Sequence, residues 1–128
     1  MKKIISESEL KELCADWQER LHLQSWDIKT GIYRERDFYG PGRQGENEYN
    51  LATGTSLIRI LDPADYPKSQ FKQDMEITLV HELLHLVFAP FEPDEEKKLK
   101  YKFMERAICQ LAGVLVSLKR ESKGEEKC

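Results

Sequence analysis

Hydrophobic residues near the start of the chain recur every three or four positions, which is the spacing of one face of an α-helix. They are Leu10, Leu13, Cys14, Trp17 and Leu21. Ser6 precedes them, and Glu9 follows it three residues later, a spacing typical of a capping box at a helix N-terminus. We therefore expect an amphipathic helix that ends near His22.

The following segments favour strands. Apolar and polar residues alternate from Trp26 to Tyr33, and this period of two predicts a strand with one face on the core. Residues 49–61 are rich in residues that favour strands, and Gly54 divides them into one or two further strands. Between these regions, residues 37–48 combine glycines and a proline with charged residues, so we expect a loop or hairpin tip that is a candidate flap.

A far more apolar segment follows the prolines near residue 65. Ser69 can cap a helix there, and this helix should end at Ala89 because the residue before Pro90 is disfavoured in helical geometry. Its apolar residues surround nearly the whole helix; they are Met75, Ile77, Leu79, Val80, Leu83, Leu84, Leu86, Val87 and Phe88. A helix of this kind is expected at the centre of the fold.

The last predicted helix begins after the turn at residues 90–93. Asp94 can cap it, its first turn is acidic, and Lys119 and Arg120 place positive charge at its end, as the helix dipole favours. The apolar residues expected on its face toward the core are Leu99, Phe103, Ile108, Leu111, Leu115 and Leu118. The charged residues 121–128 predict a flexible tail.

These elements predict one α+β domain over residues 1–120, with an N-terminal helix, a small mixed or antiparallel sheet of about three strands, a buried central helix and a C-terminal helix. The chain has 128 residues and a formal net charge of −3. Since it contains no block of five or more basic residues, we expect no nucleic-acid or membrane partner. The start of the chain has no signal-peptide pattern, so a cytoplasmic location is expected. We also expect a monomer.

The number and spacing of the cysteines favour reduced thiols, as in the cytosol. The chain has three cysteines, an odd number without the paired short spacing of a zinc knuckle. Cys14 and Cys109 lie in apolar helical patterns and are expected to be buried as small hydrophobic residues.

The central helix contains the sequence His81-Glu82-Leu83-Leu84-His85, which is an H-E-x-x-H pattern. The spacing places two imidazoles on one helical face, where both can bind a single metal ion. Zinc suits these ligands, and Glu82 lies where it can deprotonate a water molecule. The alternative is that the histidines are core residues with other partners. It is disfavoured because an unpartnered polar cluster on so apolar a helix would cost several kcal/mol.

A catalytic zinc ion needs a third protein ligand. His22 is the one remaining histidine and lies at the end of the first helix, so an acidic ligand is favoured. Glu105 should face inward, unless it pairs at the rim with Lys102 or Arg106. The residues that share its helical stripe are Tyr101, Ile108, Ala112 and Leu115. Four other carboxylates are weaker candidates for the third ligand, because they lie at the turn and the helix start, where solvent exposure and capping explain them. They are Glu92, Asp94, Glu95 and Glu96.

These motifs resemble the gluzincin metallopeptidases, in which a glutamate from the next helix joins the H-E-x-x-H pair. Nineteen residues separate His85 from Glu105, a spacing like that of the thermolysin-type members. The resemblance is closest to the minigluzincins and related small phage or bacterial metallopeptidases, with sharp motif identity confined to residues 78–112. One position departs from the thermolysin-type pattern. The aspartate four residues after the third ligand, which orients the first histidine, is replaced by Cys109. The orienting acceptor then comes from elsewhere, with Asp74 or Glu76 as candidates, or is absent.

The resemblance implies a metallopeptidase that uses one Zn2+ ion held by His81, His85 and Glu105. Glu82 would be the catalytic base that passes a proton to the leaving amine. A peptide or protein substrate would lie against the edge strand, expected near residues 55–61. The candidates for an electrophile on the carbonyl side are Tyr49, Tyr66 and Tyr101.

Other functions remain open from the sequence. A non-catalytic binding or regulatory module could use zinc for folding energy alone, but such a site has no use for Glu82. A structural protein without metal is a third alternative. In a small domain the site could also be latent, with Cys128 of the tail covering the open zinc position as a thiolate.

Overall fold

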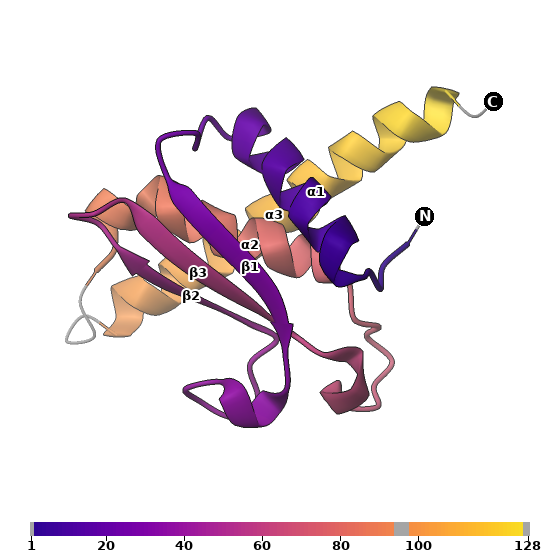
Figure 1. The fold of residues 1–128 in the computed structure, drawn as a ribbon, viewed down its shortest axis with the longest axis horizontal. Helices are drawn as coiled ribbons and strands as arrows, with labels where there is room; N and C mark the ends of the chain where they lie inside the picture. The colour runs from indigo at the N-terminus through magenta and orange to yellow at the C-terminus, as the bar shows by residue number, and fades with distance from the viewer. Residues whose placement is uncertain (1, 94–97, 127–128) are drawn as a thin grey trace.

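The computed structural model describes residues 2–93 and 98–126 and has the predicted α+β architecture. The described residues form three helices, three strands and three short 3-10 turns (Figure 1). The elements are α1 Glu7–Arg20, β1 Asp27–Tyr33, β2 Gly45–Asn50, β3 Thr55–Leu61, α2 Met75–Phe88 and α3 Lys98–Glu126. No helix in these ranges is long and apolar enough to cross a membrane.

Helix α1 forms where the apolar spacing predicts it. The hydroxyl of Ser6 accepts a hydrogen bond from the backbone N–H of Glu9, and the Glu9 carboxylate accepts one from the N–H of Ser6, which completes the capping box. The helix ends at Arg20 with Leu21 as its C-cap, and His22 then adopts a left-handed φ of 58°. Leu10, Cys14 and Trp17 are buried against the core.

The sheet is mixed, with strand order β1-β3-β2. Strand β3 pairs with β1 in parallel and with β2 in an antiparallel hairpin, whose turn contains Gly54 at a φ of 69°. The prediction that residues 55–61 form an edge strand is therefore wrong, because β3 lies between the other two. Residues 45–48, expected in a loop, belong to β2, which is an edge strand of this sheet.

Helix α2 is shorter than predicted at its N-terminus. It begins at Met75 and is capped by Asp74, whose carboxylate accepts from the N–H of Ile77. Ser69 does not cap it, because its hydroxyl accepts from the N–H of Phe71 in a local turn. The helix ends at Phe88, before Pro90, as expected, and most of its side chains are buried.

Helix α3 buries the stripe on which Glu105 was expected to face inward, and not most of the apolar residues predicted for its core face. Its buried apolar residues are Ile108, Ala112 and Val116, with Leu115 partly buried against them. The predicted core residues that are exposed instead are Leu99, Phe103, Leu111 and Leu118. The helix has two apolar stripes, and small Ala112 permits close packing on α2 through one of them. The proposed cap Asp94 lies outside the described residues, and the backbone is helical to Glu126 where a flexible tail was expected from residue 121.

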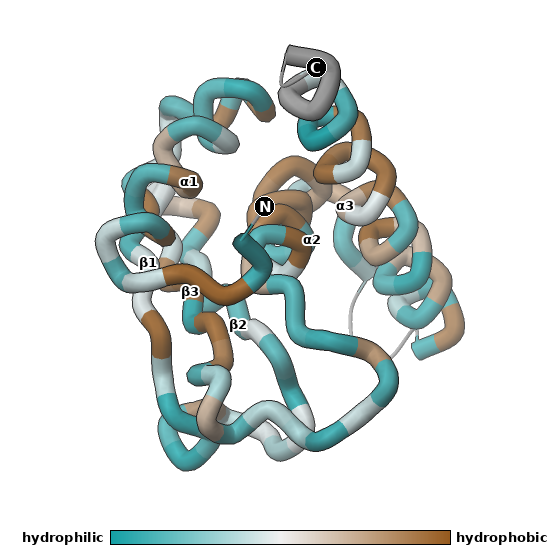
Figure 2. The backbone as a smooth tube through the Cα atoms, turned by 90° about the vertical axis from the view of Figure 1, so that its right-hand side faces the viewer, coloured by the Kyte–Doolittle hydropathy of each residue, from teal (hydrophilic) through white to brown (hydrophobic). Residues whose placement is uncertain are grey.

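Helix α2 lies between the sheet and α3 (Figure 2). One side of it contacts β2 and β3, and the other side contacts α3, while α1 packs against β1 and α2. This arrangement brings residues of α2, β2 and α3 together at one place.

Candidate metal centre

His81 and His85 project from the same face of α2, one helical turn apart. Their ring centroids are 5.2 Å from each other. The side chains are 17% and 10% exposed, because α2 is covered by neighbouring elements on both sides. Two imidazoles on a rigid, mostly buried helix form a preorganised pair of nitrogen donors.

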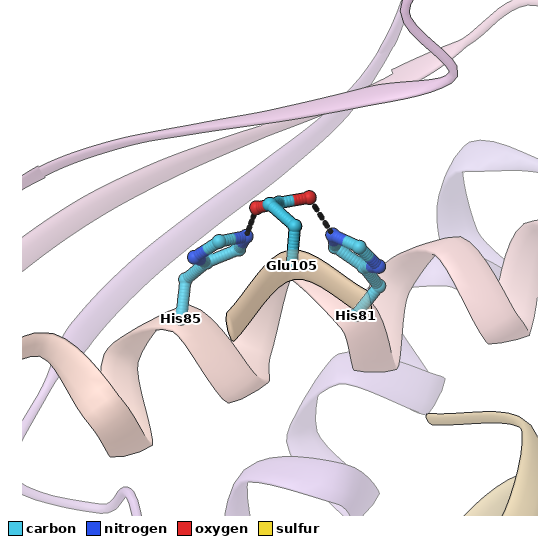
Figure 3. Close-up of side chains that lie close together, drawn as sticks. All are labelled: His81, His85 and Glu105. Atoms are coloured by element: carbon cyan, nitrogen blue, oxygen red, sulfur yellow. Dashed lines mark ion pairs between the residues drawn. The ribbon is translucent and has the colours of Figure 1, made fainter. Parts of the chain in front are cut away.

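Glu105 enters from α3 and directs its carboxylate at both imidazoles (Figure 3). Its Oε2 lies 3.3 Å from Nε2 of His81, and its Oε1 lies 2.7 Å from Nε2 of His85. One potential ligand atom from each of the three residues lies within 4.8 Å of the others, so this group could hold a metal ion. The ion pairs described for Glu105 are with these histidines, which disfavours a rim position beside Lys102 or Arg106.

The spacing and chemistry of these donors fit a small divalent cation. In a tetrahedral site with metal–ligand bonds of about 2.0–2.1 Å, neighbouring ligand atoms lie roughly 3.3 Å apart. The separations from Glu105, 3.3 Å from Oε2 to His81 and 2.7 Å from Oε1 to His85, involve different carboxylate oxygens. One donor atom from each residue lies within 4.8 Å of the others, so the side chains would move closer together around a bound ion. Two imidazole nitrogens and a carboxylate also form one of the ligand sets found around catalytic zinc.

The charges of the group are strongly coupled. Hydrogen bonds with His81 and His85 hold the pKa of the Glu105 carboxyl well below its usual range. Burial acts to lower the pKa of His85, but its contacts with Glu105 and Glu92 outweigh burial and raise this pKa to about 9. The site therefore stabilises positive charge next to Glu105.

Glu92 supports His85 from the opposite side of the ring. Its Oε1 contacts Nδ1 of His85, and its Oε2 accepts a 2.6 Å hydrogen bond from the hydroxyl of Tyr49. These contacts leave Nε2 of His85 directed at Glu105. Sequence reasoning placed Glu92 among turn and capping residues and missed this role. The available signal was its position in a short turn between Pro90 and Pro93, seven residues after His85.

Cys109 occupies the corresponding position beside His81. Its Sγ lies 3.4 Å from Nδ1 of His81, and the residue is exposed rather than buried as predicted. Cys14, by contrast, is buried as expected, and burial raises the pKa of its thiol to about 11. The position that holds an orienting aspartate in the resembled pattern therefore does contact the first histidine, but with a thiol.

Asp74 and Glu76, the expected substitutes for that aspartate, serve the other end of α2. Asp74 caps the helix and accepts two hydrogen bonds from Arg120, at 2.7 and 2.9 Å. Glu76 accepts from Lys119 at 2.6 Å and from the indole N–H of Trp17 at 2.7 Å. Both predictions are wrong, since these carboxylates join α2 to α1 and α3 and do not orient His81.

Glu82 lies next to the three donors and is 7% exposed. Burial is the largest cause of the rise in its pKa to about 7; the charges of His81 and His85 oppose the rise. Strand β2 packs directly on this residue. The side-chain amide of Asn47 donates a 2.8 Å hydrogen bond to the Glu82 carbonyl, and a Cβ added at Gly45 would lie 3.1 Å from the Glu82 carboxylate.

A cavity of about 580 Å³ opens over this group. Helix α2, β2 and α3 form its walls, and its lining includes His81, Glu82, His85, Glu105 and residues 43–47. Tyr49 and Tyr101, two of the three candidate electrophiles, also line it. The third, Tyr66, donates its hydroxyl to the carbonyl of Phe71 and is not among the lining residues. Cys128 lies outside the described residues.

Comparisons with known proteins identify no relative of the chain. No family model, curated protein or solved structure matches the chain.

Proposed function

We propose that the chain is a zinc-dependent peptidase of the gluzincin type. The observation that carries the proposal is the position of Glu82, a buried carboxylate at the base of an open cavity, directly beside three potential metal ligands. A site that held zinc for stability alone would need the three donors and a fourth ligand, but no adjacent buried base.

Zinc bound by His81, His85 and Glu105 would supply a Lewis acid that polarises a carbonyl and lowers the pKa of water. The protein supplies the proton transfer. Glu82 accepts the proton of the attacking water and delivers it to the nitrogen of the leaving amine, as a general base and then a general acid. The phenols of Tyr49 and Tyr101 line the same cavity and are the candidates to donate a hydrogen bond to the substrate carbonyl oxygen.

Strand β2 is the proposed docking edge for the substrate backbone, in place of β3. It is an edge strand in the sheet, and residues 43–47 and Tyr49 line the cavity. An extended peptide can add its main-chain hydrogen bonds to such an edge while its scissile bond lies over Glu82. This arrangement favours a peptide or protein substrate over a compact small molecule.

A second candidate is a metal-stabilised binding or regulatory module. It is supported by the origin of the ligands, because two come from α2 and one from α3, so a bound ion would join the two helices. The same ion can contribute folding energy whether or not it acts in catalysis. Glu82 distinguishes the two functions, since it matters to hydrolysis and not to metal retention.

The test combines elemental mass spectrometry with cleavage of a random peptide library. We expect near-stoichiometric zinc in the parent protein, loss of zinc in His85→Ala, and reduced zinc in Glu105→Ala. Glu82→Gln should keep its zinc and lose at least about a hundredfold in cleavage rate. Zinc retention with no Glu82-dependent cleavage would support the binding module, and iron in place of zinc would indicate that the two histidines and one carboxylate serve redox chemistry instead.

A further inference from the structure

The outer side of α3 carries a row of apolar side chains that the domain does not cover. We name this row the outer stripe. Its members are Leu99, Phe103, Ala107, Leu111, Val114 and Leu118, all of them exposed. Phe103 is 65% exposed and Leu118 is 57% exposed, so the row is open to solvent at both ends.

The outer stripe follows the helical repeat. Its members are separated by three or four positions, which places them on one face. The stripe that contains Ile108, Ala112 and Val116 is buried against the rest of the domain and points in a roughly opposite direction. Figure 2 shows that α3 lies at the outside of the molecule with α2 on its inner side. The outer stripe is thus a continuous apolar surface of the kind that marks an interaction site.

The charges beside the outer stripe are arranged with opposite signs at its two ends. Lys100 lies near its start and Glu121 lies near its end, and both are exposed. If a second α3 packs in the antiparallel direction about the middle of the stripe, Phe103 faces Leu118 and Ala107 faces Val114. The same register places Lys100 against Glu121, twice by symmetry. Parallel packing would instead place like charges together, which is unfavourable.

We propose that the chain forms a two-fold symmetric dimer in which the outer stripes of two copies pack in an antiparallel arrangement. The surface is self-complementary in apolar character and charge, as an isologous interface requires. It replaces the expectation of a monomer. The metal centre lies on the opposite side of α3, so the dimer leaves the cavity open.

Sedimentation equilibrium of the full chain tests the proposal. We expect a monomer–dimer equilibrium with a dissociation constant in the micromolar range, since a single helix pair forms a small interface. Phe103→Glu should raise this constant more than about a hundredfold. The matched control is Phe71→Glu, which changes another phenylalanine, 80% exposed and outside the outer stripe, and should leave the dissociation constant unchanged.

A charge swap tests the antiparallel register. Lys100→Glu and Glu121→Lys should each weaken the dimer by about tenfold, and the double variant should restore the parent constant. Circular dichroism and metal content should stay at the parent values, because these residues lie at the surface. A parent chain that is monomeric at millimolar concentration would overturn the dimer, and a double variant weaker than both single variants would overturn the antiparallel arrangement.

Discussion

Glu92 and Glu105 contact opposite nitrogens of the same ring, that of His85. Glu92 Oε1 contacts Nδ1, and Glu105 Oε1 lies 2.7 Å from Nε2. The first contact fixes the orientation of the imidazole, so the second nitrogen faces the remaining donors. A carboxylate behind a metal-binding histidine also increases the basicity of the ring.

Glu92→Gln should weaken zinc binding by about tenfold, because the amide keeps the shape of the side chain but loses the negative charge behind His85. Competition with a chelator measures this change. Glu48→Gln is the control, since Glu48 is a half-exposed carboxylate on β2 that pairs with Arg59 away from the donors. Equal zinc affinity in Glu92→Gln and the parent would show that the contact does not orient His85.

Cys109→Asp should tighten zinc binding by roughly tenfold. The Cys109 thiol lies 3.4 Å from Nδ1 of His81, and a carboxylate is a much stronger hydrogen-bond acceptor than a thiol. Cys109→Ala is the control that removes the weak acceptor without replacing it, and we expect a change of less than about threefold. Weaker binding by the Asp variant, measured by the same chelator competition, would contradict the proposed positioning of His81.

Gly45→Ala should destabilise the fold by about 1–3 kcal/mol, because the added methyl group would lie 2.6 Å from Cγ2 of the buried Thr78. Chemical denaturation measures the free energy of unfolding. Gly113→Ala makes the same chemical change within α3, where no neighbouring heavy atom lies within 4 Å. Gly113→Ala should stabilise the protein by about 0.5–1 kcal/mol. If both variants changed the free energy of unfolding in the same direction, the close packing of β2 on α2 would be contradicted.

Glu76→Gln should lower stability at neutral pH by about 2 kcal/mol, because it removes charged hydrogen bonds inside the domain. Burial acts to raise the pKa of Glu76, but the hydrogen bonds from Lys119 and Trp17 outweigh burial and lower it below the ordinary 4.5. A lowered carboxyl pKa contributes stability above pH 4.5 that is lost as the pH falls through the lowered value. Unfolding measured from pH 7 to pH 3 should therefore show the parent and variant converging in acid.

The three potential metal ligands could be predicted from the sequence because their positions follow from spacing within single helices. Four-residue spacing on a helix places His81 beside His85 whatever surrounds them. Glu105 could be chosen as the third donor because it shares a helical stripe with apolar residues on the next helix. The contact of Glu92 with His85 was not predicted because it depends on how the turn after α2 folds back over His85. No periodic pattern encodes that path, and capping explained a glutamate there equally well.

The fold was predicted to the extent that local patterns determine it. Alternation identified β1, and Gly54 marked the hairpin, but strand order depends on pairing between distant segments, so β3 was mistaken for an edge. In α3 two apolar stripes satisfy the same helical spacing. Only packing distinguishes them, and the buried stripe is the one with Ile108 and Ala112, on which Glu105 was expected to face inward.

The start of α3 depends on the contacts of Glu105 with His81 and His85 more than the rest of the helix does. From Lys98 to Arg106, Met104 and Glu105 are the residues that are not exposed, and the ion pairs of this stretch described here are those of Glu105. Few apolar contacts hold these turns, so their amides should exchange with solvent readily when the donors are empty. An ion that ties Glu105 to α2 would slow that exchange, and occupancy of the centre would be visible in deuterium uptake without any substrate.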